Sequence, residues 1–486
     1  MKCVFKIAAA MLFFAWSVNV WAWPSVYPTG TTIYDPEKSF NGYTVLGPMR
    51  ATEHGLPLID MNGKVVHKWM RVEGQPAKVL PGGNLMANLV FYDPKAWTER
   101  KSEGFAVVEL DWNGKEVWRF DHYEQKKPTE EMKDVGKDLI WSANAHHDFQ
   151  REGNPVGYPV PGMDYVKGGK TLIAAFKTIK GKETASLYIV DKTGKIVWEW
   201  VYKDHEKEYK DKGIADFQNT ASWVGPNKWY EQDPVKYAAF HPENIITDDG
   251  QEVIYIIDRN TGGVAWQLGP KYEKDDPLRL MGMHLPEGGF KGLPAGGMIH
   301  HAHMIPKGLP GEGNILVFNN GMPYSQVLEI DPTVGKLVWE YSGTAIGYGK
   351  NHSIAHSFFS ATVSSAQRLP NGNTFICEGN DGRLIEVTPE CEIVWEYIVP
   401  FMWYGTASGF GDEEQTVHRV KPTNSIYRAY RIPYDYIPQI KHDVERKILP
   451  PDPFLYDKAL LKNGSVQALR LRPCSRPYRP DICGSR

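Results

Sequence analysis

The feature that most constrains the fold is a short unit that recurs six times along the chain. In its clearest copy, residues 187–198, the apolar run LYIV is followed by Asp191, a turn that ends at Gly194, and a second apolar run that ends at Trp198. Apolar, β-branched runs on both sides of a short Asp- and Gly-containing turn predict a β-hairpin. The other copies lie at residues 58–66, 107–118, 256–266, 328–339 and 384–395.

Six similar β units at long intervals predict an all-β, six-bladed β-propeller, in which each small sheet buries its faces against its neighbours. Trp stands seven or eight residues after the Asp position in most copies, and we expect these rings to pack between blades. The terminal copies differ, because His67 replaces the Trp in the first and Cys391 replaces the turn Gly in the last. A ring must also close, so residues 425–431 are predicted to form a strand beside residues 43–49.

The two ends of the chain are predicted to lie outside the propeller. Lys2 and Lys6 precede an apolar run, and the small residue Ala22 closes a pattern typical of a signal peptide. We therefore expect a signal peptide at 1–22, a catalytic propeller at 23–433 and a surface extension at 434–486. The mature protein is predicted to be periplasmic or secreted, without a membrane span after signal cleavage.

Export bears on the cysteines, because disulfides persist in an oxidising compartment. Cys474 and Cys483 flank a short Pro-containing stretch and predict a loop-closing disulfide. Cys377 and Cys391 lie on successive predicted strands and either pair or remain buried free thiols. The formal net charge is −3, which provides no electrostatic case for binding nucleic acid.

A further segment ahead of the hairpins is predicted to be the innermost strand of each blade, lining the centre of the ring. These segments are 77–80, 146–150, 241–245, 300–304 and 366–369. Three of them carry His, and convergence of several His on one centre indicates a functional site more strongly than any single His does. The long connections at 123–141 and 202–236 are predicted to gather on one face beside that site.

Several of these motifs together resemble the bacterial arylsulfate sulfotransferase family. They are HHDFQ at 146–150, His241 followed eighteen residues later by Arg259, and His301 ahead of NILVFNNG at 314–321. The resemblance covers roughly residues 42–433. It implies a periplasmic six-bladed propeller that moves a sulfuryl group from an aryl sulfate ester to a phenol. The reaction would proceed through a sulfohistidine, without a nucleotide sulfate donor, a metal or another cofactor.

The resemblance also implies the site residues. His301 would be the nucleophile, and His241, Arg259 and His147 would surround the sulfuryl group and the phenolic oxygens. The expected substrate-binding residues are His146, Asn244, His300 and His303. The nucleophile itself stays open among His300, His301 and His303, because His303 shares a strand face with His301.

These residue types suit the chemistry. Sulfuryl transfer depends on positioning and on stabilising charge over the transferred oxygens. Arginine offers a planar fork to such oxygens, and a neutral imidazole can attack sulfur without prior activation. A second imidazole can protonate the departing phenolate and deprotonate the acceptor.

Two other functions are compatible with the repeats. One is a non-enzymatic propeller that binds a ligand or metal through His300, His301 and His303. The other is a quinoprotein dehydrogenase, whose Trp-containing repeats are similar but whose family uses eight blades, adjacent cysteines and a Ca²⁺ site. The expected partners are small-molecule aryl sulfates and phenols, and a homo-oligomer is compatible with the sequence.

Overall fold

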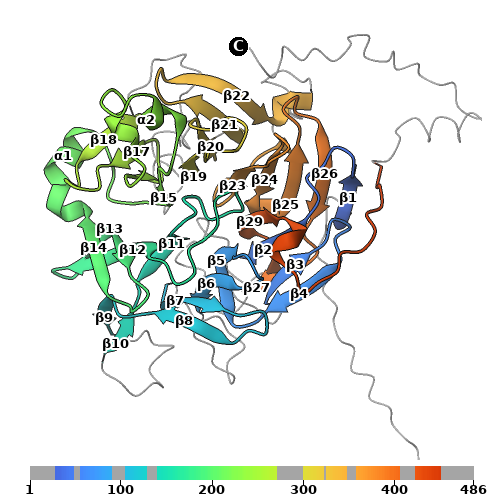
Figure 1. Ribbon diagram of the computed structural model, residues 1–486, viewed down its shortest axis with the longest axis horizontal. Coiled ribbons are helices and arrows are strands. Elements are labelled where there is room, and N and C mark those ends of the chain that lie inside the picture. Colours follow the sequence, from blue (N-terminus) through green and yellow to red (C-terminus); the bar gives the residue numbers. More distant parts are fainter. Residues whose placement is uncertain are drawn as a thin grey trace, which may run out of the picture.

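Six antiparallel sheets stand in a ring in the computed structural model, as predicted (Figure 1). The structure describes residues 28–48, 55–89, 104–127, 139–270, 299–321, 324–346, 357–404 and 422–449. The predicted signal peptide and the cysteines Cys474 and Cys483 lie outside these residues. No helix in the described part of the chain is long and apolar enough to cross a membrane.

The blades follow one another along the chain, each written here from its innermost strand outward. Blade 1 is β29 (Ile426–Ile432), β2 (Tyr43–Pro48), β3 (Leu56–Ile59) and β4 (Val65–Trp69). Blade 2 is β5 (Val72–Val79), β6 (Leu85–Leu89), β7 (Ala106–Leu110) and β8 (Glu116–Phe120). Blade 3 is β11 (Ala145–Arg151), β12 (Thr171–Ile179), β13 (Lys182–Val190) and β14 (Ile196–Val201).

The second half of the ring is built in the same way. Blade 4 is β15 (Ala221–Trp223), β16 (Ile245–Asp248), β17 (Ile254–Ile257) and β18 (Val264–Leu268). Blade 5 is β19 (Ile299–Met304), β20 (Ile315–Asn319), β21 (Gln326–Asp331) and β22 (Lys336–Ser342). Blade 6 is β23 (Ser365–Arg368), β24 (Thr374–Glu378), β25 (Arg383–Val387) and β26 (Ile393–Ile398).

Smaller elements decorate this ring. Strands β9 (Glu124–Lys126) and β10 (Ile140–Ser142) form a hairpin between blades 2 and 3, and β27 (Trp403–Tyr404) pairs with β28 (Pro422–Thr423). Helix α1 (Glu206–Asp211) lies between blades 3 and 4, and α2 (Lys228–Gln232) lies inside blade 4. The connections before β11 and β15 lead to the face where the innermost strands begin, but residues 224–236 of the second predicted connection follow β15 and leave its opposite end.

The ring closes twice, with strands from opposite ends of the chain. Strand β29 pairs with β2 from Tyr43 opposite Ile432 to Pro48 opposite Ile426, which confirms the predicted closing strand. The N-terminal β1 (Gly30–Tyr34) adds a fifth, outermost strand to blade 6 by pairing with β26. Closure removes exposed sheet edges at the point where the first and last blades meet.

The repeated Asp and Trp have separate roles. The Asp carboxylate accepts backbone N–H groups across its own turn, as Asp191 does from Thr193 and Lys195. The Trp indole N–H donates to the residue after the Asp position in the next blade. These bonds join Trp198 to the Arg259 carbonyl, Trp266 to Pro332, Trp339 to Pro389 and Trp395 to Met61. The predicted packing of these rings between blades is therefore confirmed.

The Trp bond of the sixth hairpin crosses the ring closure and gives a stability prediction. Trp395 is fully buried, and its indole N–H lies 2.8 Å from the Met61 carbonyl. Trp395→Phe should lower the free energy of unfolding by about 1–3 kcal/mol, because the smaller ring leaves a cavity and the Met61 carbonyl keeps only the longer bond from the Thr31 hydroxyl. Chemical denaturation checks this, with Val338→Ala on the exposed side of blade 5 as a control that should change little. Equal stability of Trp395→Phe and the wild type would contradict it.

The chain after β29 runs across the closure as an irregular segment. Tyr434 packs edge-on against Tyr43, Gln439 donates to the Gly82 carbonyl in blade 2, and Ile448 bridges to Tyr34 in β1. Cys377 is a buried free thiol, which excludes the bond between Cys377 and Cys391.

One predicted innermost strand is wrong. Residues 77–80, 146–150, 300–304 and 366–369 coincide with innermost strands, but residues 241–245 do not. The innermost strand of blade 4 is the three-residue β15, and an insertion carrying α2 separates it from β16. A strand of three residues has no detectable periodicity, so the prediction placed the innermost strand at residues 241–245, directly ahead of the next apolar strand.

Candidate functional site

Two of the predicted histidines occupy matching irregularities on the innermost strands. His147 has φ +63° and His301 has φ +56°, and each lies where its strand shifts register against its neighbour, in β11 and β19 respectively. These are β-bulges, which turn a side chain out of the regular alternation. Left-handed backbone at a non-glycine residue is uncommon, and outside turns it tends to cluster at functional sites. Both histidines lie near the strand starts, on one face of the propeller.

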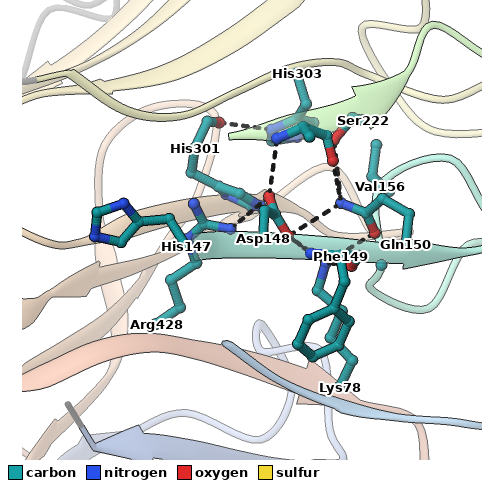
Figure 2. A network of polar contacts seen from close by, with 12 residues as sticks. Lys78, His147, Asp148, Phe149, Gln150, Val156, Ser222, His301, His303 and Arg428 are labelled. Atoms are coloured by element: carbon teal, nitrogen blue, oxygen red, sulfur yellow. Dashed lines mark hydrogen bonds and ion pairs between the residues drawn. The ribbon is translucent and has the colours of Figure 1, made fainter. Parts of the chain in front are cut away.

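A buried ionic network lies between these strands (Figure 2). The Lys78 ammonium on β5 donates to Asp148 Oδ1 at 2.7 Å and to Gln150 Oε1 at 2.8 Å. The Arg428 guanidinium on β29 donates to Asp148 Oδ2 at 2.8 Å and to the Asn219 carbonyl at 2.8 Å. All three charged side chains are almost completely buried.

This network carries one excess positive charge. Burial alone would raise the pKa of Asp148, but Lys78 and Arg428 outweigh it and lower that pKa, so the carboxylate is ionised. Burial lowers the pKa of Lys78 to about 8 against the opposing effect of Asp148, so Lys78 is protonated at neutral pH. Arg428 Nε is buried without a hydrogen-bond partner. Two cations facing one carboxylate, with a free donor, favour binding of an anion.

His301 presents a weakly bonded ring nitrogen, Nε2, beside this charge. Its Nδ1 lies 2.8 Å from the Ala366 carbonyl on β23, which accepts only, so Nδ1 carries the proton. Its Nε2 lies 3.5 Å from the Tyr430 hydroxyl on β29. Burial, followed by His303, Arg428 and Lys78, lowers the pKa of His301 well below the usual value, so the ring is neutral. A neutral imidazole with a lone pair on Nε2 is a competent nucleophile.

His303 is held at both ring nitrogens. Its Nδ1 lies 2.8 Å from the His301 carbonyl, and its Nε2 lies 3.0 Å from the hydroxyl of Tyr158, in the connection between β11 and β12. The lone pair on Nε2 is therefore occupied by the Tyr158 proton. Burial lowers the pKa of His303 to about 4.

His300 points to a different partner. Its Nδ1 lies 2.7 Å from Asn320 Oδ1, whose amide nitrogen donates to the carbonyls of Ser360 and Val363. Burial lowers the pKa of His300 to about 3. The nitrogens of His300, His301 and His303 thus face different groups, and the described residues contain no cluster of three or more metal-ligating side chains.

His146 and His147 lie among aromatic rings at the same face. The ring centroid of His146 is 4.2 Å from that of Phe176, and His147 stacks on Tyr427 at 5.5 Å. Nδ1 of each histidine is buried without a hydrogen-bond partner. Burial lowers the pKa of His146 to about 3 and that of His147 well below 6.5.

The other three predicted site residues do not join this cluster. His241 lies just before a turn between β15 and β16, where its Nδ1 accepts the Glu243 N–H at 3.1 Å. Asn244 Oδ1 accepts the Arg259 backbone N–H at 3.0 Å. The Arg259 guanidinium lies 4.1 Å from the Trp198 ring centroid and packs blade 3 against blade 4.

The expected convergence of His241 and Arg259 with His147 and His301 is therefore wrong. Arg259 follows Asp258 at the turn between β17 and β18, the position held by Pro332 and Pro389 in other blades. In an antiparallel meander this turn lies at the end opposite to the start of the innermost strand. In blade 4 that start is instead occupied by Gln218 and Asn219, just ahead of β15.

Sequence reasoning missed the residues that surround His301 from other blades. They are Lys78, Asp148, Gln150, Tyr158, Asn219, Arg428 and Tyr430. Asp148 and Gln150 lie inside the HHDFQ motif and were detectable as polar residues on a predicted buried strand. Arg428 and Tyr430 were detectable in the same way once residues 425–431 were recognised as a closing strand.

Comparison with known proteins gives one family. A family model described as arylsulfotransferase (ASST) matches residues 163–396. No curated protein matches the chain. Similar solved structures include a protein of unknown function from Bacteroides caccae, with 11% identity, TM-score 0.42, and coverage of 81% of this chain and 99% of that one. A streptogramin B lyase has 11% identity, TM-score 0.32, and coverage of 78% and 87%. These two likenesses carry no information on function.

Proposed function

Because the chain belongs to the arylsulfotransferase family, we propose that it transfers a sulfuryl group from an aryl sulfate ester to a phenolic acceptor through a sulfohistidine on His301. The observation that carries this is the neutral His301 imidazole beside a buried network with one excess positive charge. An aryl sulfate monoester carries one negative charge, which matches that excess. We also propose export through the predicted signal peptide, and independence from nucleotide sulfate donors.

The first half-reaction would form the covalent intermediate. The His301 Nε2 lone pair attacks sulfur, the bond from sulfur to the aryl oxygen breaks, and the phenolate leaves with the electron pair. The free Nε–H of Arg428 and the ammonium of Lys78 stabilise the charge on the three sulfuryl oxygens. The Ala366 carbonyl accepts a hydrogen bond from the Nδ1–H of His301 and stabilises the positive charge that develops on the attacking ring.

The second half-reaction would return the enzyme to its starting state. The acceptor phenol oxygen attacks sulfur, the bond from sulfur to Nε2 breaks, and His301 regains its lone pair. His147, with its unpartnered Nδ1, takes the acceptor proton and releases it to solvent before the next cycle. Burial lowers the pKa of His147 well below 6.5, so the ring is neutral and can accept that proton when the acceptor binds.

The two rival functions fit the structure less well. A quinoprotein dehydrogenase of the kind considered above has eight blades, whereas this ring has six. A metal site at His300, His301 and His303 would need their nitrogens to share one point, yet these nitrogens face Asn320, Ala366 and Tyr158.

The proposal is tested by incubating the purified chain with 4-nitrophenyl sulfate, with and without phenol, in the absence of nucleotide sulfate. Expected results are release of 4-nitrophenolate, formation of phenyl sulfate, and a mass increase of one sulfuryl group on the peptide that contains His301 after rapid quenching without acceptor. Release of inorganic sulfate alone, or no turnover of any aryl sulfate, would argue against the proposed transfer.

The pH dependence follows from the same groups. The attacking imidazole must be neutral, and its pKa lies well below 6.5, so kcat/KM should stay level between about pH 5.5 and 7. Lys78→Met removes a positive charge that lowers this pKa, so the acid limb should move toward 6.5. A wild-type acid limb near pH 6.5, or an unmoved limb in Lys78→Met, would contradict this assignment.

A further inference from the structure

We infer that Tyr158 and His303 are positioning residues that hold the His301 imidazole in its attacking orientation, an inference that rests on the proposed function. Neither residue offers a free group to the substrate in this arrangement. Both are fully buried, and they belong to different blades, Tyr158 following β11 and His303 lying within β19. Their connection therefore couples a loop of blade 3 to the bulged strand of blade 5.

The loop that carries Tyr158 is built to enter the centre of the ring. Asn154 Oδ1 accepts the backbone N–H groups of Val156 and Gly157 at 3.1 and 3.0 Å, and its amide nitrogen donates to the Tyr158 carbonyl at 2.8 Å. Gly157 has φ +76°, and a Cβ there would lie 2.3 Å from Gln150 Oε1 and 2.5 Å from Lys78 Nζ. Only glycine lets the loop pack this closely against the ionic network.

The direction of the hydrogen bonds can be assigned from their ends. The His301 carbonyl can only accept, so His303 Nδ1, which lies 2.8 Å from it, carries the single proton of the neutral ring. His303 Nε2 then has a lone pair and accepts the proton of the Tyr158 hydroxyl at 3.0 Å. Tyr158, His303 and His301 thus form one directed chain.

This chain acts on a strained residue. His301 lies in the bulge between the paired residues His300 and His303, where the ladder does not hold its peptide. Its left-handed backbone persists only if the surroundings favour it. The His303 bond fixes the carbonyl of His301, and the Ala366 bond fixes its ring, so the two anchors together set where Nε2 points. A shift of about 1 Å in an attacking atom can lower a rate about a hundredfold.

The test compares three variants that differ in which bond they break. Tyr158→Phe removes the donor to His303. His303→Asn replaces the Nδ1–H by an amide N–H that can still reach the His301 carbonyl. His303→Gln places its amide where Nε2 stood and loses the His301 bond. We expect kcat to fall about tenfold in Tyr158→Phe and His303→Asn and about a hundredfold in His303→Gln, with KM for the donor unchanged within about twofold.

The outcomes separate the inference from the function on which it rests. Wild-type protein is first assayed for the sulfuryl adduct on His301, and absence of the adduct there overturns the proposed function and this inference with it. If the adduct forms but Tyr158→Phe and His303→Gln keep wild-type kcat, the inference fails and the function stands. If His303→Asn and His303→Gln lose kcat equally and their Tm falls equally, the two residues are structural and the inference also fails.

Discussion

His301→Ala is expected to abolish both sulfuryl transfer and labelling of the protein by an aryl sulfate donor. Among the three neighbouring histidines, His301 combines a weakly bonded Nε2, a proton fixed on Nδ1 by Ala366, and the adjacent charges of Lys78 and Arg428. Removing a covalent nucleophile removes the route itself, so kcat/KM should fall by at least about 10³-fold. Initial rates with 4-nitrophenyl sulfate and intact-mass analysis after quenching measure the two losses.

His300→Ala is the matched control for this prediction. The two residues are adjacent and both buried, but Nε2 of His301 lies beside the ionic network, whereas His300 is bonded to Asn320. His300→Ala should retain labelling at a reduced rate. Labelling that survives His301→Ala and disappears in His300→Ala would move the nucleophile to His300 and leave the family function intact. Full activity of both variants would show that neither His301 nor His300 is the nucleophile.

Arg428→Lys and Arg259→Lys are expected to have very different effects, although the sequence pattern favoured Arg259. Arg428 joins Asp148, Asn219 and Tyr427 and keeps one unpaired Nε–H among the histidines. A lysine has no planar fork and cannot replace these contacts together. Turnover by Arg428→Lys should fall about 10²–10³-fold, the usual loss when one donor to a developing charge is removed.

Arg259→Lys should keep kcat within about threefold of the wild type, because its guanidinium packs on Trp198 and its carbonyl accepts the Trp198 indole N–H. Steady-state kinetics together with thermal unfolding measure both variants, since Arg428 is buried and the fold must be shown to survive. A large loss of kcat in Arg259→Lys with a normal Tm would restore Arg259 to the catalytic group and contradict the arrangement described above.

The propeller and part of the site were predictable because their signals are local. A hairpin with Asp at its turn and Trp at its end is encoded within about twelve residues, so each copy could be recognised alone and then counted. His147 and the histidines of β19 were predictable for the same reason, since each lies a constant number of elements ahead of its hairpin. The closing strand followed from the requirement that a ring has no free edge.

The errors in blade 4 have a physical cause as well. His241, Asn244 and Arg259 lie in a blade whose innermost strand has three residues, and the insertion with α2 shifts the remaining strands along the sequence. Periodicity over three residues cannot be distinguished from an irregular loop. Arg259 also lies at a turn position that recurs in the hairpins. Its side chain there packs on Trp198 of the neighbouring blade.

The sequence by itself determined the number of blades, the position of each hairpin and two of the three innermost strands that it predicted to bring histidine to the centre, because all of these depend on short-range pattern. Only the tertiary structure decided what those histidines meet there. Lys78, Asp148, Tyr158 and Arg428 come from three blades and a loop, and their chain separations reach 350 residues between Lys78 and Arg428. Closure of the ring sets their ionic and hydrogen-bonded partners, because it places β29 against β5. No local sequence pattern records that contact.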